Sequence, residues 1–297
     1  MFDVIVVGGG PAGLSGALML GRCRRSVLVC DLGQPRNRRT QAVHGYLTRD
    51  GIAPTDFLEA ARRELTRYGV QCRPIGVTSA EWTNDRFVVA LADQATEHAR
   101  YLLIATGVVD DLPLIPGVDD CYGQSIFHCP YCDGWEWRDR RLAALGRGRA
   151  AAQLGLGLTA WSKDVVVCSN GTRIPARERE RLEANGIGVR TGAISRVDHR
   201  DGALTGIVFA NGESMPRDAL FFSTGQHPQS DLAMRLGCEL TARGTIKTDT
   251  LSATNVSRVY VAGDASRDAQ FVVVAAAEGV KAAVAINKAL LHEELTS

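Results

Sequence analysis

The feature that most constrains the fold is a glycine-rich turn that directly follows an apolar run. Residues 2–7 read FDVIVV, the turn GGGPAG comes next, and a small-residue segment then leads to a second apolar run, SVLVCD. This order predicts a strand, a tight turn, a helix and a second, parallel strand. The turn fits the pattern G-x-G-x-x-G, and Asp31 follows Gly8 by 23 residues, close to the ~20 residues typical of dinucleotide-binding folds.

The residue types at this turn suit a pyrophosphate. Gly8 permits the tight turn, Gly10 lets the backbone approach the ligand, and Gly13 lets the helix pack against the strand. The helix N-terminus offers unpaired N–H groups to phosphate oxygens. Asp31, at the end of the second strand, can accept hydrogen bonds from ribose hydroxyls. We therefore expect a bound nucleotide, the alternative being a glycine turn without a ligand.

The same layout occurs a second time in the middle of the chain. Residues 141–168 again read strand, glycine turn, small-residue helix and strand. Each copy is later closed by an apolar strand that ends in Thr-Gly, YLLIATG at 101–107 and DALFFSTG at 218–225. The predicted fold is α/β, with two Rossmann-like nucleotide-binding domains, each of three layers (ββα), and with the second inserted into the first.

The domain boundaries are predicted from turn residues. LPLIPGV at 112–118 carries two prolines and a glycine, which is typical of a crossover between domains. We expect the first domain to span residues 1–114 and 242–297, and the inserted domain to span residues 115–241.

Composition excludes several classes of partner. The 297 residues include 34 basic and 33 acidic side chains, a net charge of +1, which favours neither nucleic acid nor a membrane surface. No apolar run is long enough to span a bilayer. The N-terminus enters a buried strand at once, so we expect no signal peptide and a cytoplasmic protein. Six of the eight cysteines stand singly and are expected to pack as small apolar side chains.

Cys129 and Cys132 are separated by two residues in the stretch FHCPYCDGWE. Zinc normally takes four ligands, and Cys121, His128 and Cys168 stand at no standard spacing, so no metal is expected. A structural disulfide would close a very small loop and add little stability. The remaining interpretation is a redox couple, because cysteines at i and i+3 meet across one helical turn and exchange readily.

The order of these motifs resembles that of the low-molecular-weight thioredoxin reductases over essentially the whole chain. The motifs that carry the resemblance are GGGPAG at 8–13, ATG at 105–107, C-x-x-C followed by Asp-Gly, the second glycine loop, and AGDA at 262–265. The resemblance implies an FAD-dependent thiol–disulfide oxidoreductase and a homodimer. Its electrons would pass between reduced nicotinamide, FAD, the cysteine pair and a protein or small-molecule disulfide.

The resemblance also assigns residues. Cys132 would exchange electrons with the flavin, Cys129 would form the mixed disulfide with substrate, and Asp133 would donate or accept the proton. Asp264 would bond the FAD ribityl chain and Gln270 would lie near the flavin. The other implied FAD positions are Pro11, Ala12, Asn37, His44, Thr106, Gly107 and Gly263. For Asp133 and Asp264 the alternative is helix capping, and for His44 it is a surface loop.

The nicotinamide site departs from the family pattern. Gly146, Gly148 and Ala151 fit G-x-G-x-x-A, which implies NADPH, but the His-Arg-Arg run that reads the 2′-phosphate is missing. Arg173 can replace part of that run, or it can be a solvated surface charge.

A second departure bears on the direction of electron flow. CPYC followed by Gly-Trp-Glu, HGYLTRDG at 44–51, TAWS at 159–162 and SRDAQFVVVAAAEG at 266–279 resemble a sub-branch that includes dithiol oxidases of gliotoxin and holomycin type. An oxygen-dependent oxidase that forms a disulfide in a small molecule is therefore an alternative, although Asp133 stands where members of that sub-branch often carry histidine. A ferredoxin-fed reductase and a non-catalytic redox-sensing flavoprotein also remain open.

Overall fold

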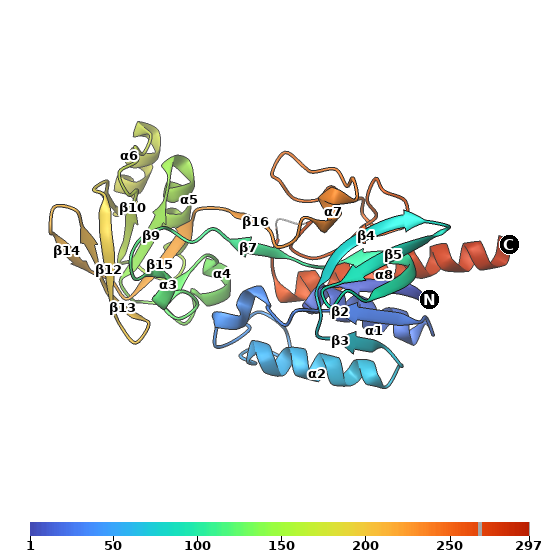
Figure 1. The fold of residues 1–297 in the computed structure, drawn as a ribbon. Coiled ribbons are helices and arrows are strands. Elements are labelled where there is room, and N and C mark those ends of the chain that lie inside the picture. Colours follow the sequence, from blue (N-terminus) through green and yellow to red (C-terminus); the bar gives the residue numbers. More distant parts are fainter. Residues whose placement is uncertain (267–268, 297) are drawn as a thin grey trace. The chain divides into compact units, whose positions relative to one another are not determined.

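The computed structural model describes residues 1–266 and 269–296. The chain forms two compact units (Figure 1). Unit 1 comprises residues 1–38, 45–109 and the chain from residue 227 onward, and unit 2 comprises residues 39–44 and 110–226. One unit is thus inserted into the other, as the doubled layout predicts.

Unit 1 is built on a seven-stranded sheet. Its strand order is β3-β2-β1-β6-β5-β4, and β17 also pairs with β6. β1, β2, β3, β6 and β17 are parallel, whereas β4 and β5 extend the sheet in antiparallel pairing. The strands are β1 (Phe2–Val7), β2 (Val27–Cys30), β3 (Gln71–Arg73), β4 (Val77–Thr83), β5 (Arg86–Leu91), β6 (Thr96–Ile104) and β17 (Val259–Val261).

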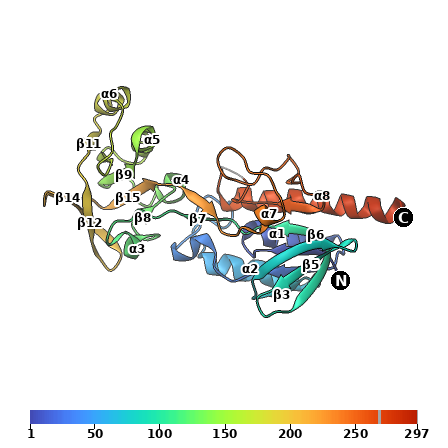
Figure 2. The same ribbon diagram turned by 45° about the horizontal axis from the view of Figure 1, so that its top comes forward.

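Helices cover one face of the parallel strands in unit 1. They are α1 (Pro11–Arg22), α2 (Pro54–Thr66) and α8 (Val272–Thr296), and a 3₁₀ helix, η1 (Arg36–Arg39), precedes α2. α8 lies along α1 in Figure 2, and both contribute to one buried apolar cluster with β1. A second cluster fills the opposite face, where β4, β5 and the short helix α7 (Leu232–Arg235) pack. The helices form one layer and the parallel strands form the second. The β4–β5 pair, which continues from β6, forms the third of the predicted ββα layers.

Unit 2 repeats this arrangement. Its parallel sheet has the order β11-β10-β9-β15-β8, and a three-stranded antiparallel sheet, β12-β13-β14, lies on the other side of a buried apolar cluster. A second cluster joins α5 and α6 to the parallel sheet. The elements are α3 (Val118–Cys121), β8 (Ile126–Phe127), α4 (Pro130–Asp133), β9 (Leu142–Gly146), α5 (Gly148–Leu158), β10 (Val165–Cys168), α6 (Ala176–Ala184), β11 (Gly188–Arg190), β12 (Ile194–Arg200), β13 (Ala203–Phe209), β14 (Ser214–Pro216) and β15 (Ala219–Ser223).

The unit boundaries differ from the predicted ones. The chain crosses at β7 (Val108–Asp110) and β16 (Gln226–Pro228), which pair with each other, instead of near 114 and 241. Each crossing strand directly follows a Thr-Gly, so that dipeptide and not the proline-rich segment marks the crossover. Residues 227–241 belong to unit 1 because Leu232 and Cys238 are buried in its core. The assignment of residues 39–44 to unit 2 was not predicted.

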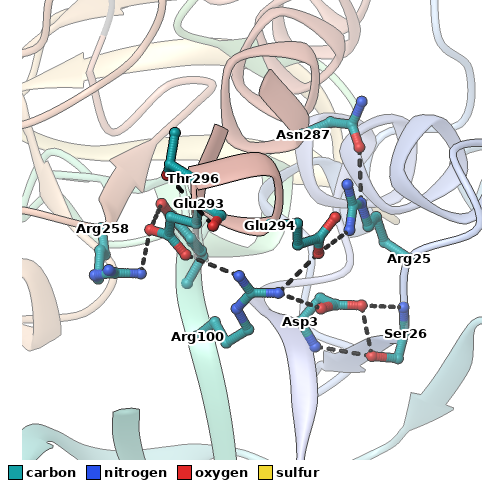
Figure 3. A network of polar contacts seen from close by, with 10 residues as sticks. Asp3, Arg25, Ser26, Arg100, Arg258, Asn287, Glu293, Glu294 and Thr296 are labelled. Carbon is teal, nitrogen blue, oxygen red and sulfur yellow. Dashed lines mark hydrogen bonds and ion pairs between the residues drawn. The ribbon is translucent and has the colours of Figure 1, made fainter. Parts of the chain in front are cut away.

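Within unit 1, a polar network connects the C-terminal end of α8 to β6 and to Arg258 (Figure 3). Arg100 on β6 donates from Nη2 to Glu293 Oε2 at 2.8 Å and from Nη1 to Glu294 Oε1 at 2.9 Å. Glu293 also accepts from Tyr101 Oη at 2.6 Å and pairs with Arg258 Nη1 at 2.6 Å. Half-buried charges with several partners fix a helix better than isolated surface pairs.

Four of the six single cysteines pack in the interior as predicted, and Cys23 is half-buried. Cys30, Cys121, Cys168 and Cys238 are buried, whereas Cys72 on β3 is exposed. β3 is the edge strand of its sheet, so its side chains are covered less than those of the inner strands.

Candidate active site

The first glycine loop has the geometry of a nucleotide cradle. Gly8 has φ +106°, and a Cβ there would lie 2.4 Å from Ala105 O, so only glycine fits. A Cβ on Gly13 would lie 1.9 Å from Gly8 O, so helix and strand meet in van der Waals contact. At Gly10 the space that a Cβ would fill is open. The N-terminus of α1 has no side-chain cap and no acidic residue in its first turn, which leaves it suited to phosphate.

The other predicted FAD positions of unit 1 gather at this loop. Thr106 N lies 3.1 Å from the position of a Gly8 Cβ, and a Cβ on Gly263 would lie 2.9 Å from Ala12 Cβ. Pro11 is the first residue of α1. The chain turns at Gly107, which has φ +70°. The Ala-Thr-Gly segment at 105–107 and the Ala-Gly-Asp segment at 262–264 therefore lie next to the glycine turn and the start of α1.

Asp31, the acid predicted to bind a ribose, has a protein partner in the structure. Its Oδ2 accepts a hydrogen bond from Arg62 Nη2 at 2.8 Å. A Cβ on Gly9 would lie 2.5 Å from the same oxygen, so the carboxylate rests directly against the turn. Arg62, on α2, was not foreseen, because a charge on a helix face carries no signal of its tertiary partner.

A second arginine joins two of the predicted FAD residues. Arg36 Nη1 lies 3.1 Å from Asp264 Oδ2 and donates to Gln270 Oε1 at 2.6 Å. Within the described residues, the buried Gln270 Nε2 has no hydrogen-bond partner, and a buried donor of this kind requires an acceptor. Asn37 is the neighbour of Arg36 in η1. The open space at Gly10 and the unsatisfied donor at Gln270 together show that these residues fit FAD.

Cys129 and Cys132 form a disulfide with a Cα–Cα distance of 5.3 Å. α4 is a single turn that begins after Cys129, and the backbone N–H of Cys132 donates to Cys129 O at 3.2 Å. Both cysteines are half-buried, so a substrate sulfur can reach the pair. Among the described residues, no three His, Cys, Asp or Glu side chains are grouped as metal ligands.

Asp133 ends α4 in an environment that favours its protonated form. Burial is the main cause, the negative charge of Glu136 adds to it and His44 opposes it, and together they raise the pKa of Asp133 to about 7. His44 Nε2 lies 3.5 Å from Glu136 Oε1. Cys129, not Asp133, is the N-cap residue of α4, and no side chain caps this helix by a hydrogen bond. The capping alternative for Asp133 is therefore disfavoured.

His44, a predicted FAD position, belongs to a different unit from the first glycine loop. Its segment, residues 39–44, belongs to unit 2, where it meets Glu136. Nothing in the sequence around His44 or around Glu136 indicates that these two side chains meet. The position of His44 relative to a flavin stays a prediction.

The second glycine loop lies between a strand and a helix, as predicted. The residues after the next strand contain no His-Arg-Arg run. Gly146 ends β9, α5 begins at Gly148, and Ala151 is buried. After β10, Ser169 Oγ donates to Thr172 O and Thr172 Oγ1 donates to Ser169 O, so this turn closes on itself. Arg173 is exposed. The geometry is that of a βαβ unit with a glycine turn between β9 and α5.

Comparison with known proteins identifies the family. The sequence profile of the pyridine nucleotide-disulphide oxidoreductases matches residues 2–279. The chain belongs to this family. The thioredoxin reductase tcpT of Claviceps purpurea is 33% identical over 277 residues, which cover 88% of this chain and 86% of that protein.

Two solved structures resemble this oxidoreductase along nearly its full length. TrxB of Bacillus anthracis is 33% identical with a TM-score of 0.95, covering 99% of this chain and 100% of that one. HlmI is 36% identical with a TM-score of 0.95, covering 99% and 94%. The predicted family, the fold of two Rossmann-like domains and the enzyme class, a flavin-dependent disulfide oxidoreductase, are confirmed.

Within residues 1–266 and 269–296 of this oxidoreductase, no helix combines the length and the apolar character that a bilayer crossing requires.

Proposed function

We propose that the protein is an FAD-dependent thiol–disulfide oxidoreductase in which Cys129 and Cys132 react with a protein or small-molecule disulfide. The Cys129–Cys132 disulfide, half-buried and followed by an Asp133 whose pKa lies near 7, carries the proposal. The glycine cradle of unit 1 supports FAD as the resident cofactor. When bound, FAD supplies the two-electron chemistry that links the cysteine pair to a donor or acceptor.

The exchange step uses the two cysteines in order. The Cys129 thiolate attacks the substrate disulfide, forms the mixed disulfide and releases one substrate thiolate. The Cys132 thiolate then attacks Cys129 Sγ, re-forms the Cys129–Cys132 disulfide and releases the second thiolate. The enzyme pair is oxidised by two electrons and the substrate is reduced by two. Asp133 donates a proton to a leaving thiolate, which its half-neutral state near pH 7 permits.

Exposed aromatic side chains lie within a few residues of the two cysteines in the sequence and bear on the substrate. Tyr131, between the two cysteines, is 77% exposed, and Trp135 is 64% exposed. The Tyr131 ring packs edge-on against Trp161 at 5.5 Å, and the Arg138 guanidinium stacks over Trp135 at 4.3 Å. An apolar or aromatic group next to the reacting disulfide fits this surface, since such rings bury large area with few rotatable bonds.

The donor is proposed to be NADPH, bound by the loop of Gly146, Gly148 and Ala151 with Arg173 near the adenosine. The open space at Gly148 and the absence of an acidic residue from the first turn of α5 support a phosphate there. A homodimer is carried over as a proposal from the thioredoxin reductase resemblance, and a cytoplasmic location is proposed from the sequence.

An oxygen-dependent dithiol oxidase is the second candidate. The turn after β10 satisfies its own hydroxyl groups and Arg173 is exposed, so specific binding of the 2′-phosphate has little support. In this direction a small-molecule dithiol would reduce the Cys129–Cys132 disulfide, and oxygen would be the terminal two-electron acceptor, giving hydrogen peroxide.

An anaerobic titration with NADPH, followed by flavin absorbance, separates the two candidates. Rapid bleaching by NADPH supports the reductase. If neither NADPH nor NADH bleaches the flavin but a dithiol does, electrons enter through the cysteine pair and the oxidase is favoured. A protein that no donor reduces contradicts both candidates.

A further inference from the structure

Two ionisable side chains flank Asp133 and have no role in the thiol–disulfide exchange steps. His44 Nε2 lies 3.5 Å from Glu136 Oε1, and their side chains are 22% and 38% exposed. Glu136 follows Asp133 by three residues, whereas His44 is 89 residues earlier in the chain. Within the described residues, the charged groups that act on Asp133 are these two.

The segment that carries His44 is held in place at both ends. At its start, Arg39 donates from Nη1 to Asp119 Oδ1 at 2.7 Å and from Nη2 to Asp119 Oδ2 at 3.2 Å. Just before its end, Val43 is buried. A two-pronged arginine–carboxylate pair fixes orientation even where it adds little stability. His44 therefore faces Glu136 because a distant part of the chain is anchored there.

We propose that His44 and Glu136 are positioning residues that set the protonation of Asp133, and through it the supply of protons to the Cys129 and Cys132 thiols. The inference rests on the proposed function, since it concerns the same thiol–disulfide reaction. Anionic Glu136 disfavours the ionised form of Asp133, and protonated His44 favours it. His44 Nε2 and Glu136 Oε1 also face each other at 3.5 Å, so a change in either side chain alters the surroundings of the other.

The balance of these opposing charges suits a group that must both give and take a proton. A donor or acceptor is most effective when its pKa lies near the working pH. Burial is the main cause of the raised pKa of Asp133, Glu136 raises that pKa further, and His44 lowers it. The contact between them limits both effects.

The test is the pH dependence of alkylation of the reduced Cys129–Cys132 pair by iodoacetamide in the FAD-loaded enzyme. Mass spectrometry of the peptides reports the reaction, and a Cys72→Ser background removes the exposed cysteine. Ionised Asp133 disfavours the neighbouring thiolates, so its titration appears as an inflection. Glu136→Gln is expected to move this inflection to lower pH and His44→Gln to higher pH, each by roughly half a unit or more.

Two further variants make the test specific. In an Asp133→Asn background, both shifts are expected to vanish. His199→Gln is the matched control, since His199 Nε2 lies 3.5 Å from Asp120 Oδ2 in the same unit, and it should leave the inflection unchanged. Shifts of the same sign in both variants, shifts that persist without Asp133, or an equal shift in the control would overturn the inference.

Failure of this inference can be told apart from failure of the proposed function. Alkylation reports ionisation whatever the electron donor, whereas disulfide turnover that survives Cys132→Ser would contradict the reaction itself. Each of the two charge variants has its own expected direction for the shift of the inflection. If one variant fails to fold, the other still tests the inference.

Discussion

Arg36 and Asp264 are 228 residues apart in the sequence, and their side chains meet with Nη1 3.1 Å from Oδ2. The same nitrogen donates to Gln270, so one guanidinium contacts two of the residues that the thioredoxin reductase resemblance places at FAD. The pair is largely buried, where charge-assisted hydrogen bonds are strong and an unpaired charge is costly.

Arg36→Ala is therefore expected to weaken FAD binding about tenfold or more, a loss of about 1.4 kcal/mol or more. Titration of the apoprotein with FAD, followed by flavin fluorescence, measures the dissociation constant. Arg63→Ala is the control, because Arg63 is exposed and pairs only loosely with Glu59, at 3.9 Å. Equal FAD affinity in the Arg36 variant and the native protein would show that the arginine does not organise this site.

Cys132→Ser is expected to retain FAD and to lose disulfide turnover, because the second exchange step has no nucleophile. Flavin content and steady-state turnover with a model disulfide are the measurements. Cys72→Ser, which alters an exposed free cysteine, should leave turnover unchanged. Normal turnover in the Cys132 variant would contradict the assignment of the redox pair.

Gly279→Ala is expected to destabilise unit 1 by about 3 kcal/mol, since a Cβ there would lie 1.9 Å from Ala12 O and α8 would have to move away from α1. Gly157→Ala, on the exposed side of α5 with nothing within 4 Å of the new Cβ, should instead stabilise its helix by up to about 1 kcal/mol. Thermal unfolding of both variants tests the contrast. A similar change in both would show that the α1–α8 contact adapts.

Glu293→Gln is expected to cost about 1–3 kcal/mol at pH 7. Burial alone raises the pKa of Glu293, but hydrogen bonds from Tyr101, Arg258 and Arg100 outweigh it and hold that pKa below its ordinary value of 4.5. The carboxylate thus contributes stability above pH 4.5 that is lost as the pH falls through the lowered pKa.

Urea unfolding of the Glu293 variant and the native protein at several pH values tests this dependence. The difference in unfolding free energy should be largest at neutral pH and shrink in acid. Glu59→Gln removes an exposed carboxylate and should change stability little at any pH. A difference that stays constant into acid would exclude the proposed electrostatic cause.

Local signals in the sequence predicted the frame of the molecule. A glycine turn between two apolar runs can only be accommodated by a βαβ unit, so Gly8, Gly13 and Asp31 indicated the first cradle. The Cys129–Cys132 spacing predicted a pair that meets across one turn. The domain boundary near 241 was wrong. The short helix α7 packs into the core of unit 1, and no local pattern in the sequence after Thr224-Gly225 indicates which of the two cores it joins.

By itself, the sequence determined the features that short-range geometry dictates: two units that each contain a glycine turn between parallel strands, a close cysteine pair and an acid beside it. The tertiary structure decided which charges face one another. Arg36 meets Asp264, Arg62 meets Asp31, and His44 meets Glu136, each across a long stretch of chain. The physical reason is that an ion pair depends on a distance of a few ångströms between side chains, which hydrophobic packing of distant segments sets and which no local pattern encodes.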